Sequence, residues 1–291
     1  MKELHNQDLK QWNSFRTGGI ADIIYLPESQ DELIALADSL SYDFYVIGSG
    51  TNLLVSDNGI KKPIICTKRL CSYEVEGREI IAEAGVLSKE VSRVACSLSM
   101  VGFEFLDGIP GTIGGAVYGN SGSGGESISE LFRRATLLSC KNHIINIKHR
   151  DDMGFSRRFS DLQGRKAILL SVILSGKESS TRTSFRKKKD LNYVLKETKR
   201  LGKIRTKNQP LGFPSAGTVF RYPDYVKEAY SKIRVKSKGD AVVSKLNSGF
   251  ILNKEKATSR DIYSLIQSVR KETIDITGKD PELEIQLLGE M

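Results

Sequence analysis

Histidine and cysteine are scarce, since the 291-residue chain has three histidines and four cysteines. No Cys-x-x-Cys pair is present and no cluster of histidines accompanies the cysteines, which are Cys66, Cys71, Cys96 and Cys140. In a chain long enough to build a large core, this pattern favours buried or free thiols over disulfides or zinc ligands. We therefore predict no metal site.

Long apolar runs are also missing. No run approaches the roughly 18 residues that a membrane-spanning helix needs, and the first eight residues contain no apolar signal core. The composition, 39% hydrophobic and 27% charged, is typical of globular proteins. We expect a cytoplasmic protein without a membrane partner, and the length predicts two or three domains.

Positive charge is concentrated in one segment. Residues 182–207 contain eleven lysines and arginines and two acidic residues, a net charge of +9 that equals the net charge of the whole chain. The segment has two aromatic residues, Phe185 and Tyr193, and its pattern is largely helical. A solvated basic helix or linker is the favoured interpretation, followed by steering of an anionic ligand and last by nucleic-acid binding.

Strand and helix patterns are mixed along the chain. Strands are expected at 21–26, 44–47, 64–67, 79–84, 135–138, 144–147, 167–174, 218–222, 250–253 and 284–288, and helices at 31–40 and 87–100. The clearest helix is expected after Thr258, because Thr258 and Asp261 resemble a capping box, and Gly278 fits its end. This mixture predicts an α+β fold with several sheets rather than one doubly wound sheet.

Two glycine-rich segments are candidates for phosphate contact, because glycine lets backbone N–H groups approach a phosphate closely. The first, at 48–52, follows an apolar strand. Leu53 stands where a dinucleotide-binding fingerprint needs its third glycine, and a strand and a turn are expected next instead of a helix. That fingerprint is therefore excluded, while phosphate contact and an ordinary tight turn both remain open.

The second segment, which we expect to form a loop at 108–125, has eight glycines in eighteen residues. Because glycine loses more entropy on folding than any other residue, this density weakens a fold unless something requires it. A diphosphate lying against bare backbone is such a requirement. Apolar residues between the glycines, including Ile113 and Val117, argue against a disordered linker. The sequence Gly-x-x-x-x-Gly-Lys-Ser/Thr of P-loop NTPases is absent.

With three further motifs, these segments resemble the UDP-N-acetylenolpyruvoylglucosamine reductase family over nearly the whole chain. The motifs lie at 13–19, 48–54, 104–116, 214–221 and 283–285. The most specific is Glu-Phe-Leu-Asp-Gly-Ile-Pro-Gly-Thr-Ile-Gly-Gly-Ala at 104–116. The chain is similar to the shorter type of this family, which lacks an extra substrate loop.

The resemblance implies an α+β, FAD-binding fold of the PCMH or vanillyl-alcohol-oxidase kind. It implies FAD-binding subdomains at 1–66 and 67–200 and a C-terminal substrate-binding domain at 208–291, whose last strand can pack back on the FAD-binding part. Non-covalent FAD is expected, because neither glycine segment contains a histidine. The residues expected at FAD are Gly48, Ser49, Gly50, Thr51, Asn52, Gly111, Thr112, Gly114, Gly115, Asn120 and Ser121.

The resemblance further implies an oxidoreductase of peptidoglycan synthesis, and thus of cell-wall biogenesis, cell shape and division. It would use NADPH to convert UDP-N-acetyl-3-O-(1-carboxyvinyl)glucosamine to UDP-N-acetylmuramate, as a monomer without a nucleic-acid partner. Arg158 matches the family arginine that pairs with the substrate carboxylate, and Glu284 matches the C-terminal glutamate. Thr218 stands where the family usually has a proton-donating serine. Residues 239–244 and 247–253 would contribute to substrate binding.

The sequence departs from the family pattern at two positions near the expected substrate. Arg157 stands where tyrosine is usual, and Tyr222 stands where asparagine is usual. Three alternatives therefore stay open. The chain could be another FAD-dependent oxidoreductase or oxidase of the same fold, a family member with reduced activity, or a non-catalytic nucleotide- or nucleic-acid-binding protein that uses its basic segment.

Overall fold

The computed structural model describes residues 1–164, 167–176 and 187–291, and the chain forms two compact units. The first unit consists of Met1–Lys2, Tyr25–Ser49 and Ile65–Arg205, and the second consists of Glu3–Ile24, Gly50–Ile64 and Thr206–Met291. The chain therefore passes from one unit to the other inside the first glycine segment, between Ser49 and Gly50. The division into three subdomains at 1–66, 67–200 and 208–291 stays a prediction.

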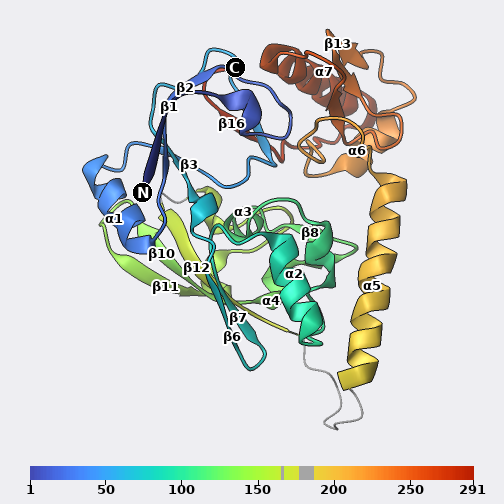
Figure 1. Cartoon of the computed structure of the whole chain (residues 1–291). Helices are drawn as coiled ribbons and strands as arrows, with labels where there is room; N and C mark the ends of the chain where they lie inside the picture. Colours follow the sequence, from blue (N-terminus) through green and yellow to red (C-terminus); the bar gives the residue numbers. More distant parts are fainter. Residues whose placement is uncertain (165–166, 177–186) are drawn as a thin grey trace. The chain divides into compact units, whose positions relative to one another are not determined.

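An antiparallel sheet of five strands forms the centre of the first unit, in the order β11-β10-β12-β7-β6 (Figure 1). Its strands are β6 (Tyr73–Glu76), β7 (Glu79–Glu83), β10 (Phe132–Ser139), β11 (Ile145–His149) and β12 (Ala167–Ser175). Four of these five strands, all except β6, were expected from the sequence.

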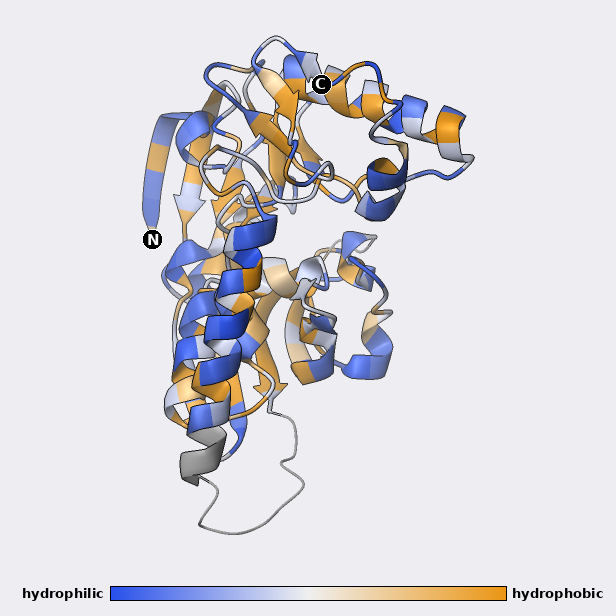
Figure 2. Cartoon of the chain, turned by 90° about the vertical axis from the view of Figure 1, so that its right-hand side faces the viewer, coloured by the Kyte–Doolittle hydropathy of each residue, from blue (hydrophilic) through white to orange (hydrophobic). Residues whose placement is uncertain are grey.

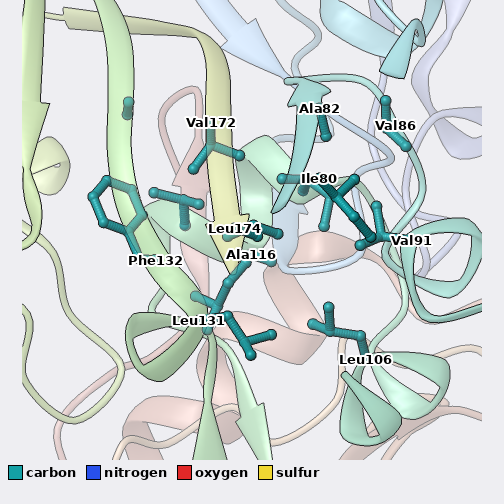
Figure 3. Close-up of a cluster of buried hydrophobic side chains, with 14 of the residues drawn as sticks. Ile80, Ala82, Val86, Val91, Leu106, Ala116, Leu131, Phe132, Val172 and Leu174 are labelled. Atoms are coloured by element: carbon teal, nitrogen blue, oxygen red, sulfur yellow. The ribbon is translucent and has the colours of Figure 1, made fainter. Parts of the chain in front are cut away.

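The larger apolar core of the first unit lies on one face of this sheet. Three helices add side chains to this core, and they are α2 (Ser88–Ser97), α3 (Ile113–Tyr118) and α4 (Ile128–Leu131). Figure 3 shows Val172 and Leu174 of β12 close to Ala116 of α3 and Ile80 of β7. These side chains are almost completely buried, so the sheet holds α3, and with it the second glycine segment, in a fixed place.

A smaller core joins the sheet to helix α1 (Gln30–Ser39). Leu33 and Leu36 of α1 cluster with Ile168 and Leu170 of β12. The pairing of β10 with β12 shifts register beside Leu170, and such a bulge changes which face successive side chains occupy. Ile168 and Leu170 before the shift therefore face α1, while Val172 and Leu174 after it face the larger core.

The remaining elements of the first unit are short, apart from one long helix. They are β3 (Tyr45–Ile47), β8 (Gly122–Ser123), β9 (Glu126–Ser127) and α5 (Lys187–Asn208), which ends just past the unit boundary. Helix α5 is mostly hydrophilic in Figure 2, although Val194 is buried. It confirms the helix expected in the basic segment, whose residues 182–186 lie outside the described residues.

The second unit combines small sheets with two helices. Strands β13 (Ser237–Lys238), β14 (Ala241–Val243) and β15 (Ile251–Asn253) form an antiparallel sheet. Strands β4 (Leu53–Val55) and β16 (Gln286–Leu288) pair in parallel. The core between these strands and the helices α6 (Pro223–Ala229) and α7 (Ser259–Thr277) includes Val219, Phe220 and Ile285. Strand β1 (Lys2–Asp8) lies almost wholly in this unit.

Helix α7 confirms the predicted capping in detail. The Thr258 side chain accepts from the Asp261 backbone N–H, and the Asp261 carboxylate accepts from the Thr258 backbone N–H, both at 3.0 Å. Gly278 follows with a φ of 70°, which glycine adopts without a steric penalty. Strands β2 (Ile20–Leu26) and β5 (Ile64–Cys66) also lie where they were expected, and each crosses a boundary between the units.

Two predictions were wrong. The second glycine segment was expected as a loop, but α3 forms inside it. The strand expected at 218–222 is reduced to isolated bridges at Thr218 and Phe220.

Within the described residues, no helix is both long and apolar enough to span a membrane.

Candidate functional site

The two glycine segments touch within the first unit. Gly48, directly after β3, lies so close to Thr112 that a Cβ added to Gly48 would stand 2.4 Å from Thr112 Oγ1. The same hydroxyl accepts from the Gly115 backbone N–H at 3.3 Å and caps α3. A side chain at position 48 would therefore displace the cap of the helix in the second segment.

The glycines of the second segment differ in what they contact. The Ile113 and Gly114 backbone N–H groups donate to the carbonyls of Val86 and Ala84, each at 2.8 Å. A Cβ on Gly114 would stand 2.9 Å from the Ala84 carbonyl oxygen. Glycine at 114 is thus required by the fold itself. At Gly115, an added Cβ would have Thr112 Oγ1 as its nearest neighbour, at 3.6 Å, so this glycine borders open space.

Asn120 connects the second glycine segment to a turn at 156–159. The Asn120 amide donates to the Ser156 carbonyl at 2.7 Å and accepts from the Ser129 backbone N–H at 3.2 Å. The residue is buried, with 5% of its surface exposed. Its side chain therefore acts as a structural link. After it, the Ser121 N–H donates to the Ala116 carbonyl at 2.8 Å and ends the helical turn.

Arg158 occupies that turn in a left-handed conformation, with a φ of 55°. Ser156 and Phe159 each donate their backbone N–H to the other's carbonyl, at 3.1 Å, so Arg157 and Arg158 form a two-residue turn. Left-handed backbone is unfavourable for residues other than glycine. The Arg158 guanidinium Nη2 donates to the Gly122 carbonyl at 2.9 Å. Arg158 is half-buried and held, unlike a freely solvated surface arginine.

Thr218 and Glu284 meet in the second unit, although 66 residues separate them in sequence. The Thr218 hydroxyl donates to Glu284 Oε2 at 3.1 Å, and both residues are half-buried. The backbone fixes this geometry, because the Glu284 N–H donates to the Val219 carbonyl at 2.9 Å. On its other side, Thr218 forms a bridge with Phe250.

The second half of the first glycine segment adjoins this pair. Asn52 Nδ2 donates to the Glu284 carbonyl at 3.2 Å, and the Asn52 carbonyl accepts from the Gln286 N–H at 2.9 Å. Gly50 has a φ of 67°, and a Cβ there would stand 2.0 Å from the Trp12 carbonyl oxygen. Gly50 is thus required by the backbone path that brings Asn52 to Glu284.

The predicted site residues therefore form two groups. The first unit contains Arg158 and the expected FAD residues Gly48, Ser49, Gly111, Thr112, Gly114, Gly115, Asn120 and Ser121. The second unit contains Thr218, Glu284 and the expected FAD residues Gly50, Thr51 and Asn52. Sequence analysis overlooked Gln163, whose side chain contacts the Arg158 backbone. A contact inside an irregular turn leaves no periodic pattern that could have revealed it.

A groove elsewhere in the second unit includes none of the predicted site residues. It has a volume of about 460 Å³ and borders the start of α7, with Lys10, Asp57 and Arg260 in its lining. The Asp57 carboxylate accepts from the Ser259 and Arg260 N–H groups at 3.0 and 3.1 Å. The helix N-terminus, which favours a negative charge, is thus already satisfied. Among the described residues, no cluster of His, Cys, Asp or Glu could hold a metal ion.

Glu104, the first residue of the most specific motif, is a buried acid in the first unit. It is 3% exposed. Its Oε2 accepts from the Gly102 N–H at 2.7 Å, while Oε1 has no hydrogen-bond partner among the residues that the structure describes. Burial raises the pKa of the Glu104 carboxyl, and the negative charges of Glu126 and Glu197 add to this. Charging Glu104 therefore costs free energy in the folded state.

Comparison with known proteins finds two matching families along the chain. Residues 21–147 match the family described as FAD binding domain. Residues 209–288 match the family described as UDP-N-acetylenolpyruvoylglucosamine reductase, C-terminal domain.

Similar proteins extend over almost the full length. The UDP-N-acetylenolpyruvoylglucosamine reductase of Caldanaerobacter subterraneus subsp. tengcongensis is 36% identical over 98% of this chain and 93% of its own. That of Caldicellulosiruptor bescii is 35% identical over 99% of this chain and 91% of its own. The crystal structure of UDP-N-acetylenolpyruvylglucosamine reductase from Thermus caldophilus has a TM-score of 0.79, 24% identity, and coverage of 99% and 98%. The predicted α+β, FAD-binding fold is confirmed.

Proposed function

The chain belongs to the UDP-N-acetylenolpyruvoylglucosamine reductase family, and from this premise we propose that it reduces the enolpyruvyl ether of a UDP-sugar. The product of that reaction is UDP-N-acetylmuramate, a precursor of peptidoglycan. The protein is accordingly an FAD-dependent oxidoreductase. The observation that carries the proposal is the hydrogen bond from Thr218 to Glu284 beside Asn52. It lies in a chain whose residues 209–288 match the C-terminal domain of this family and whose residues 21–147 match an FAD binding domain.

FAD fits the first-unit residues that were expected to hold it. Gly48 and Gly115 lack side chains on either side of the Thr112 hydroxyl, and bare backbone of this kind lets a phosphate approach closely. Gly114 is occupied by its own contact with Ala84, so we assign the approach to Gly48, Thr112 and Gly115. When bound, FAD supplies hydride transfer between a nicotinamide and the substrate alkene.

Thr218 and Glu284 are suited to the proton transfer that this reduction needs. Hydride addition to the distal alkene carbon leaves negative charge on the carbon that bears the ether and the carboxylate. One proton must reach that carbon. The Thr218 hydroxyl has a single proton, which it shares with Glu284 at 3.1 Å. We propose that Thr218 delivers this proton, and that Glu284, after taking up a proton from solvent water, returns one to the Thr218 oxygen, so that the two act as one general acid.

Arg158 is suited to stabilise the negative charge on the substrate. A guanidinium pairs with a carboxylate through parallel, charge-assisted hydrogen bonds. The contact of Nη2 with the Gly122 carbonyl and the turn at 156–159 restrict where this group can lie. Less free energy is needed to orient a guanidinium whose position is already restricted than to orient a mobile one. We propose that Arg158 binds the substrate carboxylate and favours the enolate.

The remaining parts of the proposal concern the donor and the setting. We propose that NADPH is the hydride donor, and that the protein acts as a monomer in the cytoplasm, because nucleotide sugars and reduced nicotinamides are produced inside cells. No nucleic-acid or membrane partner is proposed. NADPH and the UDP-sugar are both anionic. The described basic residues of α5, including Lys199 and Lys203, would attract both of them.

Absorbance spectra of the purified protein test the function. A flavin spectrum that bleaches when NADPH is added without oxygen, and that returns rapidly on adding the enolpyruvyl UDP-sugar, is the expected result. Rapid return with oxygen but not with the UDP-sugar would identify an oxidase instead. A colourless protein that does not take up added FAD would refute the proposal.

A further inference from the structure

Gln163 joins the turn that carries Arg158 to the second glycine segment. Its Nε2 donates to the Arg158 carbonyl at 3.1 Å and to the Tyr118 carbonyl at 3.0 Å. Tyr118 is the last residue of α3, in the glycine segment. One side-chain amide thus spans the backbone of the arginine and the end of the helix that Thr112 caps.

This contact is made at a residue whose backbone conformation is unfavourable. Arg158 has a φ of 55°, in the left-handed region that residues with a Cβ avoid. Its peptide planes therefore need external hydrogen bonds to keep this conformation. The paired bonds between Ser156 and Phe159 close the turn but leave the Arg158 carbonyl outside it. Gln163 is a donor that meets this carbonyl.

Neighbouring contacts attach both ends of the turn to the same short segment. Asn120 holds the Ser156 carbonyl, and the Arg158 guanidinium holds the Gly122 carbonyl. Ser160, completely buried, donates to the Tyr118 carbonyl at 2.8 Å beside Gln163. Gln163 differs from Asn120 and Ser160 in that it bonds to the backbone of Arg158 itself.

We propose that Gln163 is a positioning residue for Arg158. By holding the Arg158 carbonyl against the end of α3, its amide sets the direction in which the guanidinium meets the substrate carboxylate. The inference rests on the proposed role of Arg158. It predicts that Gln163 matters for reaction with substrate only as long as Arg158 is present.

A double-mutant cycle on the FAD-loaded full chain tests this proposal. The enzyme is reduced by NADPH without oxygen and mixed with the enolpyruvyl UDP-sugar, and the return of flavin absorbance gives a rate constant. Gln163→Leu, which has a similar size and no donor, should lower this constant by about tenfold to a hundredfold, as small displacements of catalytic groups do. In the Arg158→Ala chain, the same substitution should change it by less than about twofold.

Controls separate positioning from folding. Asn146→Ala removes an equivalent bond from a side-chain amide to a backbone carbonyl, 3.0 Å long, in β11, and should leave the rate constant within about twofold of wild type. If Gln163→Leu does not fold, Gln163→Glu replaces it, because glutamate has the same length and no N–H donor.

The outcomes distinguish this inference from the proposed function. Equal losses in the presence and absence of Arg158, or no loss in either, would overturn the positioning role alone. A wild-type chain whose reduced FAD does not react with the UDP-sugar would overturn the proposed function and the positioning role together.

Discussion

Replacing Thr218 by valine tests the central chemical step of the proposed reaction. Valine keeps the branched shape and the extended backbone of threonine but has no hydroxyl. The Thr218 hydroxyl donates to Glu284 at 3.1 Å, so the substitution removes the proton that we assign to the carbanion. It leaves the Glu284 backbone bond to Val219 in place.

The expected effects on stability and on rate differ enough to be told apart. A hydrogen bond to a carboxylate contributes about 1.5–3 kcal/mol to the free energy of unfolding. Because Thr218 is only half-buried, its substitution by valine should lower that free energy by less, about 1 kcal/mol. Loss of a general acid lowers the rate by about 10²–10⁴-fold. At 1.36 kcal/mol per decade this is roughly 3–5 kcal/mol of transition-state stabilisation. The rate should therefore fall far more than the stability does.

A single-turnover measurement gives the decisive comparison. The NADPH-reduced enzyme is mixed with the UDP-sugar, and flavin reoxidation is followed in wild type, Thr218→Val and Thr218→Ser. The serine variant keeps the hydroxyl and should stay within about tenfold of wild type. Thr277→Val, which removes a hydroxyl that donates to the Thr273 carbonyl in α7, controls for stability. An unchanged rate constant in Thr218→Val would remove Thr218 from proton delivery.

Three further predictions concern FAD binding, pH and stability. Gly48→Ala should weaken FAD binding, measured by flavin titration, by at least about tenfold, because the new Cβ would stand 2.4 Å from Thr112 Oγ1. The control Gly164→Ala should leave FAD binding unchanged, because no described atom lies within 4 Å of the new Cβ. The Glu104→Gln variant should gain stability relative to wild type as pH rises above 4.5, the ordinary pKa of a glutamate, because the raised pKa of Glu104 in the folded state makes its ionisation costly. Urea midpoints of the two proteins that keep a constant difference from about pH 4 to about pH 8 would contradict this. Asp57→Ala should lower the free energy of unfolding by about 0.5–2 kcal/mol, because α7 loses the cap of two N–H groups; an unchanged urea midpoint would show that other groups replace it.

Local patterns were sufficient where local contacts decide the structure. Helix α7 could be predicted because its cap, its apolar spacing and its terminal Gly278 all lie within the helix or beside it. Strand β1 could not, because its residues are polar and mostly exposed, so no alternation marks it. Its extended form depends on strand pairing, which the sequence pattern of one segment does not contain.

The candidate site shows the same limit more sharply. Nothing in the spacing of Thr218 and Glu284 predicts their contact, since they lie 66 positions apart in the sequence. They were named because the chain resembles a family, and their catalytic roles stay predictions, although the structure brings the two side chains into hydrogen-bond contact. Gln163 was not named, because its role follows only from the bonds of a turn whose conformation is unfavourable for arginine.

The glycines of the second segment show why density alone overstates a binding site. Sequence reasoning took the density of glycines as a sign of diphosphate contact and named Gly111, Gly114 and Gly115 for it. Gly114 instead lies against Ala84, with its N–H already donated to that carbonyl, whereas Gly115 borders open space beside Thr112. The fold needs the first and leaves the second available to a ligand. A Cβ at Gly114 should therefore reduce stability before it affects FAD, and a Cβ at Gly115 should affect FAD first, because only at Gly115 does the added atom enter space that a phosphate could use.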